Sequence, residues 1–366
     1  MADTMNHLER GMASLGNKPV DRLLTYPLAM GVCRRLLNDG KGVTYKEWAS
    51  DPKLYAAAFI AGQKFFDFDF AIGLMDLSVM AGDLGAHVRM DSENTPFVDK
   101  HIVHSPEDYE KFQVPDVKKG RCGVLLEGTK MFTDKLKSEV ICAGFIEGPL
   151  LALSQSAGAE RLFMDMFTNP SAVHKAMETM TEFDSQLVEG FAKTGVAGLT
   201  WDYLWANYSC LGDKEYNEFE KSYAMKLNKQ VVDAGMAVCI HNCADMPHLQ
   251  TQVHDYKTAI YSMAYYPLVP ESPSAAKVIA DGYADNCIIG GNIDPQMFIR
   301  ATTEKITKVT SDLVSEVKTA LCKRGLNSKY CIASGCEVPP DLVTKMENIA
   351  AVVNTVKKEG APLKSF

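Results

Sequence analysis

The chain has 366 residues, of which 46% are hydrophobic and 23% charged, and its formal net charge is −8. This composition is typical of a globular protein with a large buried core, and it excludes a largely disordered chain. The negative charge, without any concentrated basic segment, argues against nucleic acid or an anionic membrane surface as a partner.

Targeting signals and cysteine usage indicate a cytoplasmic protein. No apolar run reaches the roughly 18 residues that a membrane helix needs, and the N-terminal segment MADTMNHLERG lacks the apolar stretch of a signal peptide. The 10 cysteines are too sparse for a disulfide scaffold, so we expect free thiols or metal ligands. Most of them, such as Cys239 and Cys331 in apolar runs, are expected to be small buried residues.

Short apolar runs recur along the chain between longer segments with helical periodicity. Continuous rather than alternating apolarity is typical of strands that are covered on both faces. The runs are LLTYPLAM (23–30), FAIGLM (70–75), ICAGFIEG (141–148), VAGLTW (196–201), MAVCIH (236–241), AIYSMAYY (259–266), NCIIGG (286–291) and YCIAS (330–334). They predict a parallel sheet.

Helical segments separate these runs. Residues 171–195 and 295–321 carry apolar side chains at three- and four-residue intervals, which predicts two long helices. Gly195 is expected to end the first, and Asp294, followed by Pro295, is expected to cap the second. Alternation of eight strands with helices predicts a single (β/α)8 TIM-barrel domain over residues 1–366, with additional helices near the N-terminus. Neither a GxGxxG nor a GxxxxGK[ST] motif is present, which argues against a nucleotide-binding fold.

A metal-binding pattern follows two of the predicted strands. His241 ends the strand MAVCIH, Cys243 follows two positions later, and Cys336 stands in IASGCEVPP after a later strand. In extended backbone, residues i and i+2 point to one face about 6.5–7 Å apart, so His241 and Cys243 can reach one zinc ion. Three protein ligands with an open fourth position are typical of catalytic zinc. The alternative is that the His-x-Cys pair arises by chance and that Cys336 only packs.

Other polar residues near strand ends are candidates for the same site, because reactive groups of a barrel gather where its strands end. We predict catalytic roles for two of them and cofactor-binding roles for four. The catalytic candidates are Glu147 and Asp202, and the cofactor-binding candidates are Asp76, Asn207, Asn292 and Asp294. Asp294 has the alternative role of a helix cap, and Asp76 that of a hydrogen-bonded barrel carboxylate. Gly291 and Gly335 are expected to be required by the backbone geometry beside the site.

Four segments in order along the chain resemble the uroporphyrinogen decarboxylase superfamily. They are VMAGDLGAHVRMDSENTPFV (79–98), the stretch from GPLLALSQ to TMTEF (148–183), GGNIDPQMF (290–298) and GCEVPPDLVTKMENIAAVV (335–353). The resemblance covers nearly the whole chain and implies the barrel fold. Homodimers occur in that superfamily, so it also implies a homodimer as one oligomeric state.

Within that superfamily, the His-x-Cys pair with a distant Cys resembles the zinc motif of the methylated-corrinoid-protein:thiol methyltransferases. His241, Cys243 and Cys336 fall on its three positions. The resemblance implies a zinc ion, a corrinoid (cobalamin) supplied by a transient partner protein, and a small methyl donor or acceptor, most simply a thiol such as coenzyme M. The same site would serve demethylation of a methyl ether or methylthiol towards cob(I)alamin, and the sequence leaves the direction open.

Two rival functions remain at this stage. The first is decarboxylation of a porphyrinogen-like tetrapyrrole, in which Asp76 would occupy the position of the catalytic aspartate. However, TYPLAMGVCRRLLNDGKG departs from the arginine-rich N-terminal motif of the decarboxylases, and the adjacent Arg34 and Arg35 cannot both face a site from one helix. The second rival is a non-catalytic barrel that binds a corrinoid.

Overall fold

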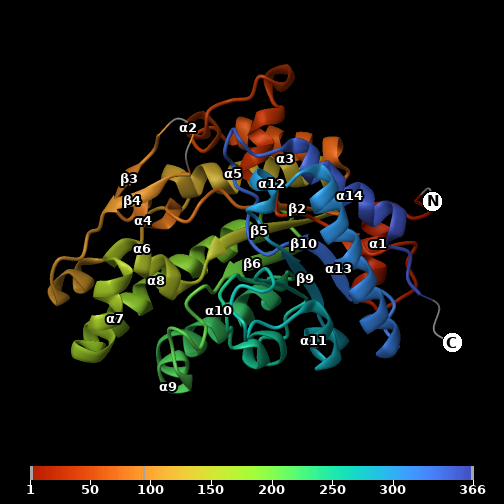
Figure 1. Ribbon diagram of the computed structural model, residues 1–366. Coiled ribbons are helices and arrows are strands. Elements are labelled where there is room, and N and C mark those ends of the chain that lie inside the picture. The colour runs from red at the N-terminus through yellow and green to blue at the C-terminus, as the bar shows by residue number, and fades with distance from the viewer. Residues whose placement is uncertain (1–2, 92, 94, 364–366) are drawn as a thin grey trace.

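The computed structural model describes residues 3–363 except 92 and 94. Its centre is an eight-stranded parallel sheet in the order β1-β10-β9-β8-β7-β6-β5-β2, which curls into a nearly closed barrel (Figure 1). The strands are β1 (Leu24–Thr25), β2 (Phe70–Gly73), β5 (Ile141–Glu147), β6 (Gly198–Asp202), β7 (Ala237–Asn242), β8 (Ile260–Met263), β9 (Ile288–Ile293) and β10 (Tyr330–Ser334). Each predicted apolar run overlaps one of them, and the predicted barrel is confirmed.

Helices pack around this barrel, and a separate antiparallel hairpin of β3 (His87–Arg89) and β4 (Phe97–Lys100) lies outside it. The α-helices are α1 (His7–Leu15), α2 (Tyr45–Trp48), α3 (Pro52–Phe66), α4 (Val79–Asp83), α5 (Gly120–Leu136), α6 (Pro149–Ala157), α7 (Ala159–Thr168), α8 (Pro170–Ala192), α9 (Asp213–Tyr216), α10 (Ser222–Asp233), α11 (Ala275–Ala280), α12 (Met297–Arg300), α13 (Thr303–Lys323) and α14 (Met346–Glu359). Short 3₁₀ and π turns are η1 (Gly31–Leu36), η2 (Asn38–Gly40), η3 (Pro106–Lys111), η4 (Asn217–Lys221), η5 (Thr251–Asp255) and η6 (Tyr283–Asp285). None of the helices in the described ranges has the length and apolarity needed to cross a bilayer.

The two long predicted helices differ in outcome. The first is α8, and Gly195 follows it with a φ of +81°, a conformation that glycine adopts without strain. The second is divided, because the chain becomes extended at Ala301 and starts again as α13 with Thr302 as its N-cap. The prediction that Asp294 caps this helix is wrong: α12 begins at Met297, and the Asp294 carboxylate accepts a hydrogen bond from the Gln296 N–H at 2.8 Å inside a turn.

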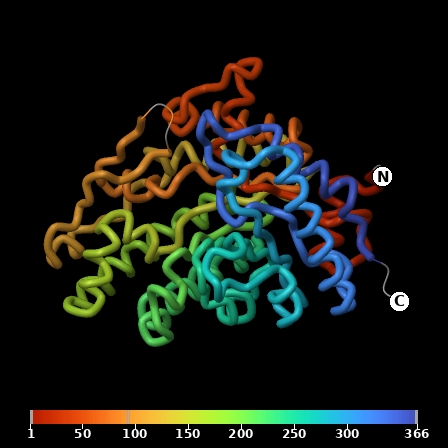
Figure 2. Tube along the Cα trace, in the orientation of Figure 1, coloured from red at the N-terminus to blue at the C-terminus, as the bar shows by residue number. Residues whose placement is uncertain are grey.

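The barrel is closed between β1 and β2 by side chains as well as backbone. One backbone hydrogen bond crosses this seam, from the Asp69 N–H to the Thr25 carbonyl at 3.2 Å, and the Asp69 carboxylate accepts the Thr25 N–H at 2.8 Å. The two ends of the chain lie on the same side of the barrel (Figure 2). There, His7 of α1 and Lys357 of α14 both contact Asp67 just before β2.

Candidate metal centre

The C-terminal ends of four neighbouring strands place polar side chains in one row. The parallel register pairs Glu147 of β5 with Asp202 of β6, Asp202 with His241 of β7, and His241 with Ser262 of β8. Residues paired across a sheet point to the same face. This row therefore runs along one face of the sheet, at the end where barrel enzymes hold their reactive groups.

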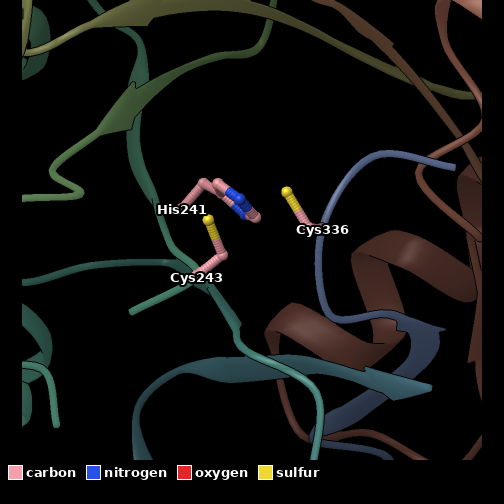
Figure 3. Close-up of side chains that lie close together, drawn as sticks. All are labelled: His241, Cys243 and Cys336. Atoms are coloured by element: carbon pink, nitrogen blue, oxygen red, sulfur yellow. The ribbon is translucent and has the colours of Figure 1, made fainter. Parts of the chain in front are cut away.

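Three potential metal ligands converge at this end. His241, Cys243 just beyond β7, and Cys336 in the loop after β10 each offer one donor atom, and the three atoms lie within 4.8 Å of one another. In Figure 3, His241 and Cys243 extend from the end of β7 and Cys336 from the facing loop, and the three side chains point towards one another. His241 is buried and the two cysteines are half-buried, so the centre is shielded from bulk water on most sides.

The position of Cys336 depends on the glycine before it. A Cβ atom on Gly335 would lie 1.9 Å from the backbone nitrogen of Tyr265, so only glycine lets the chain pass so close to the loop after β8. The Gly335 N–H also donates to the Ile293 carbonyl at 2.8 Å. Gly291, in β9, has a φ of +147° and a Cβ there would lie 2.9 Å from Met263 Cγ. Both predicted glycine requirements are confirmed.

Hydrogen bonding orients the imidazole. His241 Nδ1 lies 2.9 Å from Ser262 Oγ, which leaves Nε2 for a metal ion. A second partner of this kind fixes the tautomer of a histidine ligand. Cys336 contacts both Cys243 and His241. These contacts hold the pKa of the Cys336 thiol well below its usual value, although burial opposes the effect. A lowered thiol pKa favours the thiolate, the form that binds metals.

The donor set fits zinc. One imidazole nitrogen and two thiolates are common zinc ligands, and donors on one tetrahedral zinc lie roughly 3.3–3.8 Å apart for bonds of about 2.0–2.3 Å. Cys336 is distant in the sequence from His241 and Cys243, but the fold brings all three donor atoms to within 4.8 Å of one another, a limit about 1 Å above the spacing around a bound zinc ion. Two soft thiolates argue against magnesium or calcium, which prefer oxygen ligands.

Two buried carboxyl groups adjoin this centre. Asp202 Oδ1 and both carboxyl oxygens of Glu147 are buried and have no hydrogen-bond partner among the described residues. Burial raises the pKa of Asp202 to about 6, although the neighbouring His241 opposes the rise. Burial and the nearby charges of Asp76 and Asp202 raise the pKa of Glu147 well above its usual value. This rise favours the protonated form of Glu147, which can donate a hydrogen bond.

Asp76 has strong partners of its own. Its carboxylate forms an ion pair with the Arg121 guanidinium and accepts hydrogen bonds from the Ser78 N–H at 3.0 Å and from the Ser78 hydroxyl. Arg121 also donates to Ser78 Oγ at 3.0 Å. Arg121 and Ser78 thus engage the carboxyl group of Asp76 in a buried ion pair and hydrogen-bond network.

The remaining predicted site residues lie on three loops or strand ends. Asn292, in β9, is buried and its side-chain nitrogen has no partner among the residues that the structure describes. Asn207 uses its amide to close its own loop, donating to the Leu204 carbonyl at 2.7 Å and accepting the Cys210 N–H at 3.0 Å. Asp294, as described above, closes a turn. Asn292 is thus the one of these with a free hydrogen-bonding group.

Sequence reasoning missed two residues that the geometry brings to the site. Ser262 lies within a predicted strand, but only the register places it opposite His241. Glu337 follows Cys336 directly; its carboxyl group accepts the Gly31 N–H at 2.9 Å, and burial raises its pKa to about 8. Neither residue carries a spacing signal, although Glu337 adjoins a predicted ligand.

The chain is matched by the model of a known family. The family model described as uroporphyrinogen decarboxylase (URO-D) matches residues 6–359, and the chain belongs to this family. The predicted superfamily is thereby confirmed.

Relatives within the family are methyltransferases by name. The methylcobamide:CoM methyltransferase MtbA of Methanosarcina acetivorans is 24% identical over 322 residues, which cover 87% of this chain and 91% of that protein. The methylcobamide:CoM methyltransferase MtaA of Methanosarcina barkeri is 21% identical over 347 residues, covering 94% and 95%. A solved methyltransferase structure from Methanosarcina mazei superposes with a TM-score of 0.79 at 19% identity, covering 97% of this chain and 99% of that one. This structural likeness independently supports the fold.

Proposed function

We propose that this protein is a zinc-dependent methyltransferase that moves a methyl group between a corrinoid, carried on a partner protein, and a small thiol such as coenzyme M. The observation that carries the proposal is the convergence of one imidazole and two thiols within 4.8 Å at the C-terminal end of the barrel. The names of the relatives, which specify methylcobamide and CoM, supply the substrate classes.

The roles of the residues follow from their surroundings. His241, Cys243 and Cys336 would hold the metal, and Ser262 would keep His241 Nε2 directed towards it. A bound zinc ion would supply Lewis acidity, keeping a coordinated substrate thiol in its thiolate form at neutral pH. The half-buried setting excludes much of the competing water.

Asp202 and Glu147 are proposed to act on the substrate side of the same centre. Because its pKa is about 6, Asp202 is mainly ionised at pH 7 and can accept the proton that a thiol loses. Glu147, whose raised pKa favours the protonated form and whose two oxygens are unpartnered, is proposed to donate a hydrogen bond to a polar substrate group. Asn292, with its free amide nitrogen, is proposed to donate a hydrogen bond to the corrinoid or the substrate. Asp76, Asn207 and Asp294 are proposed as more peripheral contacts, in which the two carboxylates would accept hydrogen bonds.

The rival decarboxylase function has less support from the geometry. Its substrate carries several carboxylates, which demand free arginines. Instead, Arg34 donates to the Pro340 carbonyl and pairs with Glu93, and Arg35 donates to the carbonyls of Asp341 and Thr344. Arg121 pairs with Asp76. These five partners engage all three of these arginines, so none of the three is free to bind a substrate carboxylate.

The test combines metal content with turnover. Zinc per chain would be measured by mass spectrometry in the wild-type protein and in His241→Ala and Cys336→Ser variants, with Cys210→Ser, an exposed cysteine, as the matched control. Demethylation of methylcobalamin by coenzyme M would be followed by absorbance in the same preparations. We expect about one zinc per chain and turnover in the wild type and the control, and at least a ~100-fold loss of turnover without the ligands.

Two results would contradict the proposal in different ways. Absence of zinc from the wild type, with no uptake on addition, would remove the metal mechanism altogether. Zinc that depends on the three ligands, without methyl transfer to any of a panel of thiols or from methyl ethers and methylthiols, would instead favour the non-catalytic barrel.

A further inference from the structure

The barrel encloses a cavity that lies apart from the two candidate cysteine ligands, Cys243 and Cys336. It has a volume of about 640 Å³ and runs inside the barrel from the N-terminal ends of the strands up to His241 and Ser262. Cys243 and Cys336 do not line it. The cavity therefore lies beneath the metal centre and reaches only the inner side of His241 and its serine partner.

The hollow interior results from a row of very small residues. The register pairs Ala143 of β5 with Gly198 of β6, and Gly198 with Ala237 of β7, and all three line the cavity. At the corresponding positions, barrels of this type are normally filled by layers of bulky branched side chains. Three adjacent strands thus leave one side of the barrel interior unfilled.

The cavity opens at the end of the barrel opposite the metal ligands. Met12 of α1 and Val232 of α10 line its entrance and are each 57% exposed. Lys137 also lies at this entrance, but its ammonium group pairs with Asp134 at 3.2 Å. A ligand can therefore enter from the N-terminal face without passing the metal centre.

The lining specifies the chemistry of an occupant. Most of it is aliphatic or aromatic, including Ile72, Phe145 and Ile260, so a charged molecule would lose its hydration without compensation. The polar groups of Lys137, at the entrance, and of His241 and Ser262, at the inner end, have partners of their own. Thr200 Oγ1, also in the lining, is buried and has no hydrogen-bond partner among the described residues. Thr200 stands on β6 two residues before Asp202, on the same face of the strand.

We propose that this cavity binds an uncharged, mainly hydrocarbon small molecule that carries one hydrogen-bonding group, with Thr200 as the polar anchor. Dry apolar cavities bind molecules such as benzene, and displacement of poorly ordered water from an apolar site favours binding. Because the occupant would contact His241 and Ser262 from below, its presence would also be sensed at the metal centre. The proposal does not rest on the proposed methyl transfer.

The experiment uses the purified full-length protein and an uncharged fluorescent probe, N-phenyl-1-naphthylamine. Benzyl alcohol and toluene, which differ by one hydroxyl group, would compete for the site. Ala143→Leu and Ala237→Leu would fill the cavity, singly and together, whereas Ala350→Leu would place the same side chain on α14 outside it. Thr200→Val would remove the anchor while keeping the volume.

We expect saturable binding of one probe per chain, displaced by both competitors. The combined cavity-filling variant should bind the probe at least tenfold more weakly, and Ala350→Leu should bind it as the wild type does. Thr200→Val should weaken benzyl alcohol by about 3–10-fold and leave toluene unchanged. Circular dichroism and thermal unfolding would confirm that each variant is folded.

Three outcomes would overturn the proposal. The first is that the wild type shows no saturable probe binding. The second is that a folded cavity-filling variant binds the probe as tightly as the wild type does. The third is that more than one probe binds per chain and that Ala350→Leu changes this binding as much as the cavity-filling substitutions do. An equal loss of both competitors in Thr200→Val would refute the anchor. These binding measurements do not depend on methyl transfer, so a protein without that activity would give the same results.

Discussion

Ser262 shows how one uncharged residue can orient a proposed metal ligand, His241. Its hydroxyl lies 2.9 Å from His241 Nδ1, which leaves the other ring nitrogen, Nε2, for a metal ion. Rotation of the ring would turn Nε2 away from the two cysteines, since both nitrogens move with it. The partner of a ligating histidine therefore contributes to metal affinity without touching the metal.

Replacement of Ser262 by alanine is expected to lower zinc affinity by roughly 10–100-fold, as loss of such partners usually does. Zinc affinity would be measured by competition with a chromogenic chelator. Ser315→Ala, on the exposed face of α13, is the matched control and should keep the wild-type affinity. Unchanged affinity in Ser262→Ala would show that packing alone orients His241.

At the scale of elements, the division between α12 and α13 shows how a capping residue overrides periodicity. Apolar spacing continues through residues 295–321, but Thr302 adopts an extended conformation and its side chain accepts the Lys305 N–H at 3.3 Å. Capping satisfies a backbone donor that would otherwise be unpaired at a new helix start. The break lets α12 lie after β9 while α13 runs back along the barrel.

Thr302→Ala is expected to lower the free energy of unfolding by about 1 kcal/mol, because the first turn of α13 loses its cap. Urea denaturation would measure the change. Thr319→Ala makes the same substitution inside α13, where an exposed hydroxyl donates to the Ser315 carbonyl, and should change stability by less than ~0.5 kcal/mol. Equal effects of the two substitutions would argue against capping by Thr302.

At the scale of the whole molecule, a network of charges at the seam joins both ends of the chain to the barrel. The buried Asp69 carboxylate accepts hydrogen bonds from Arg10 at 2.8 Å and Arg22 at 2.7 Å. His7 contacts Asp67 at 2.8 Å and Asp69 at 2.9 Å. Burial opposes protonation of His7, but the two aspartates outweigh it and raise its pKa to about 9.

This shift predicts a pH dependence with a defined sign. Because the pKa of His7 rises from 6.5 to about 9 on folding, its stabilising effect is complete below pH 6.5 and is lost as the pH rises through 9. His7→Gln should therefore be less stable than the wild type at pH 6, by a smaller margin at pH 8, and not at all at pH 10. Urea denaturation at these three pH values would check this, and a margin independent of pH would contradict it.

The amino-acid sequence by itself determined the number and order of the barrel strands. Continuous apolar runs such as 141–148 and 196–201 are typical of strands buried on both faces, and that property is local, so each run overlaps a strand. The three ligand candidates were also visible, because a His-x-Cys pair at a strand end lies on one face whatever the rest of the fold. That the whole chain is one domain stays a prediction.

Only the tertiary structure decided what surrounds those ligands. The pairing of Ser262 with His241, the ion pair of Arg121 with Asp76, and the row Ala143–Gly198–Ala237 all depend on strand register or on contacts between elements far apart in the chain. In the sequence, Asn207 and Asp294 were as suitable for cofactor binding as Asn292, but in the structure their side chains form hydrogen bonds within their own loops. Hydrogen bonding and burial are properties of three-dimensional neighbours, and local sequence does not contain them.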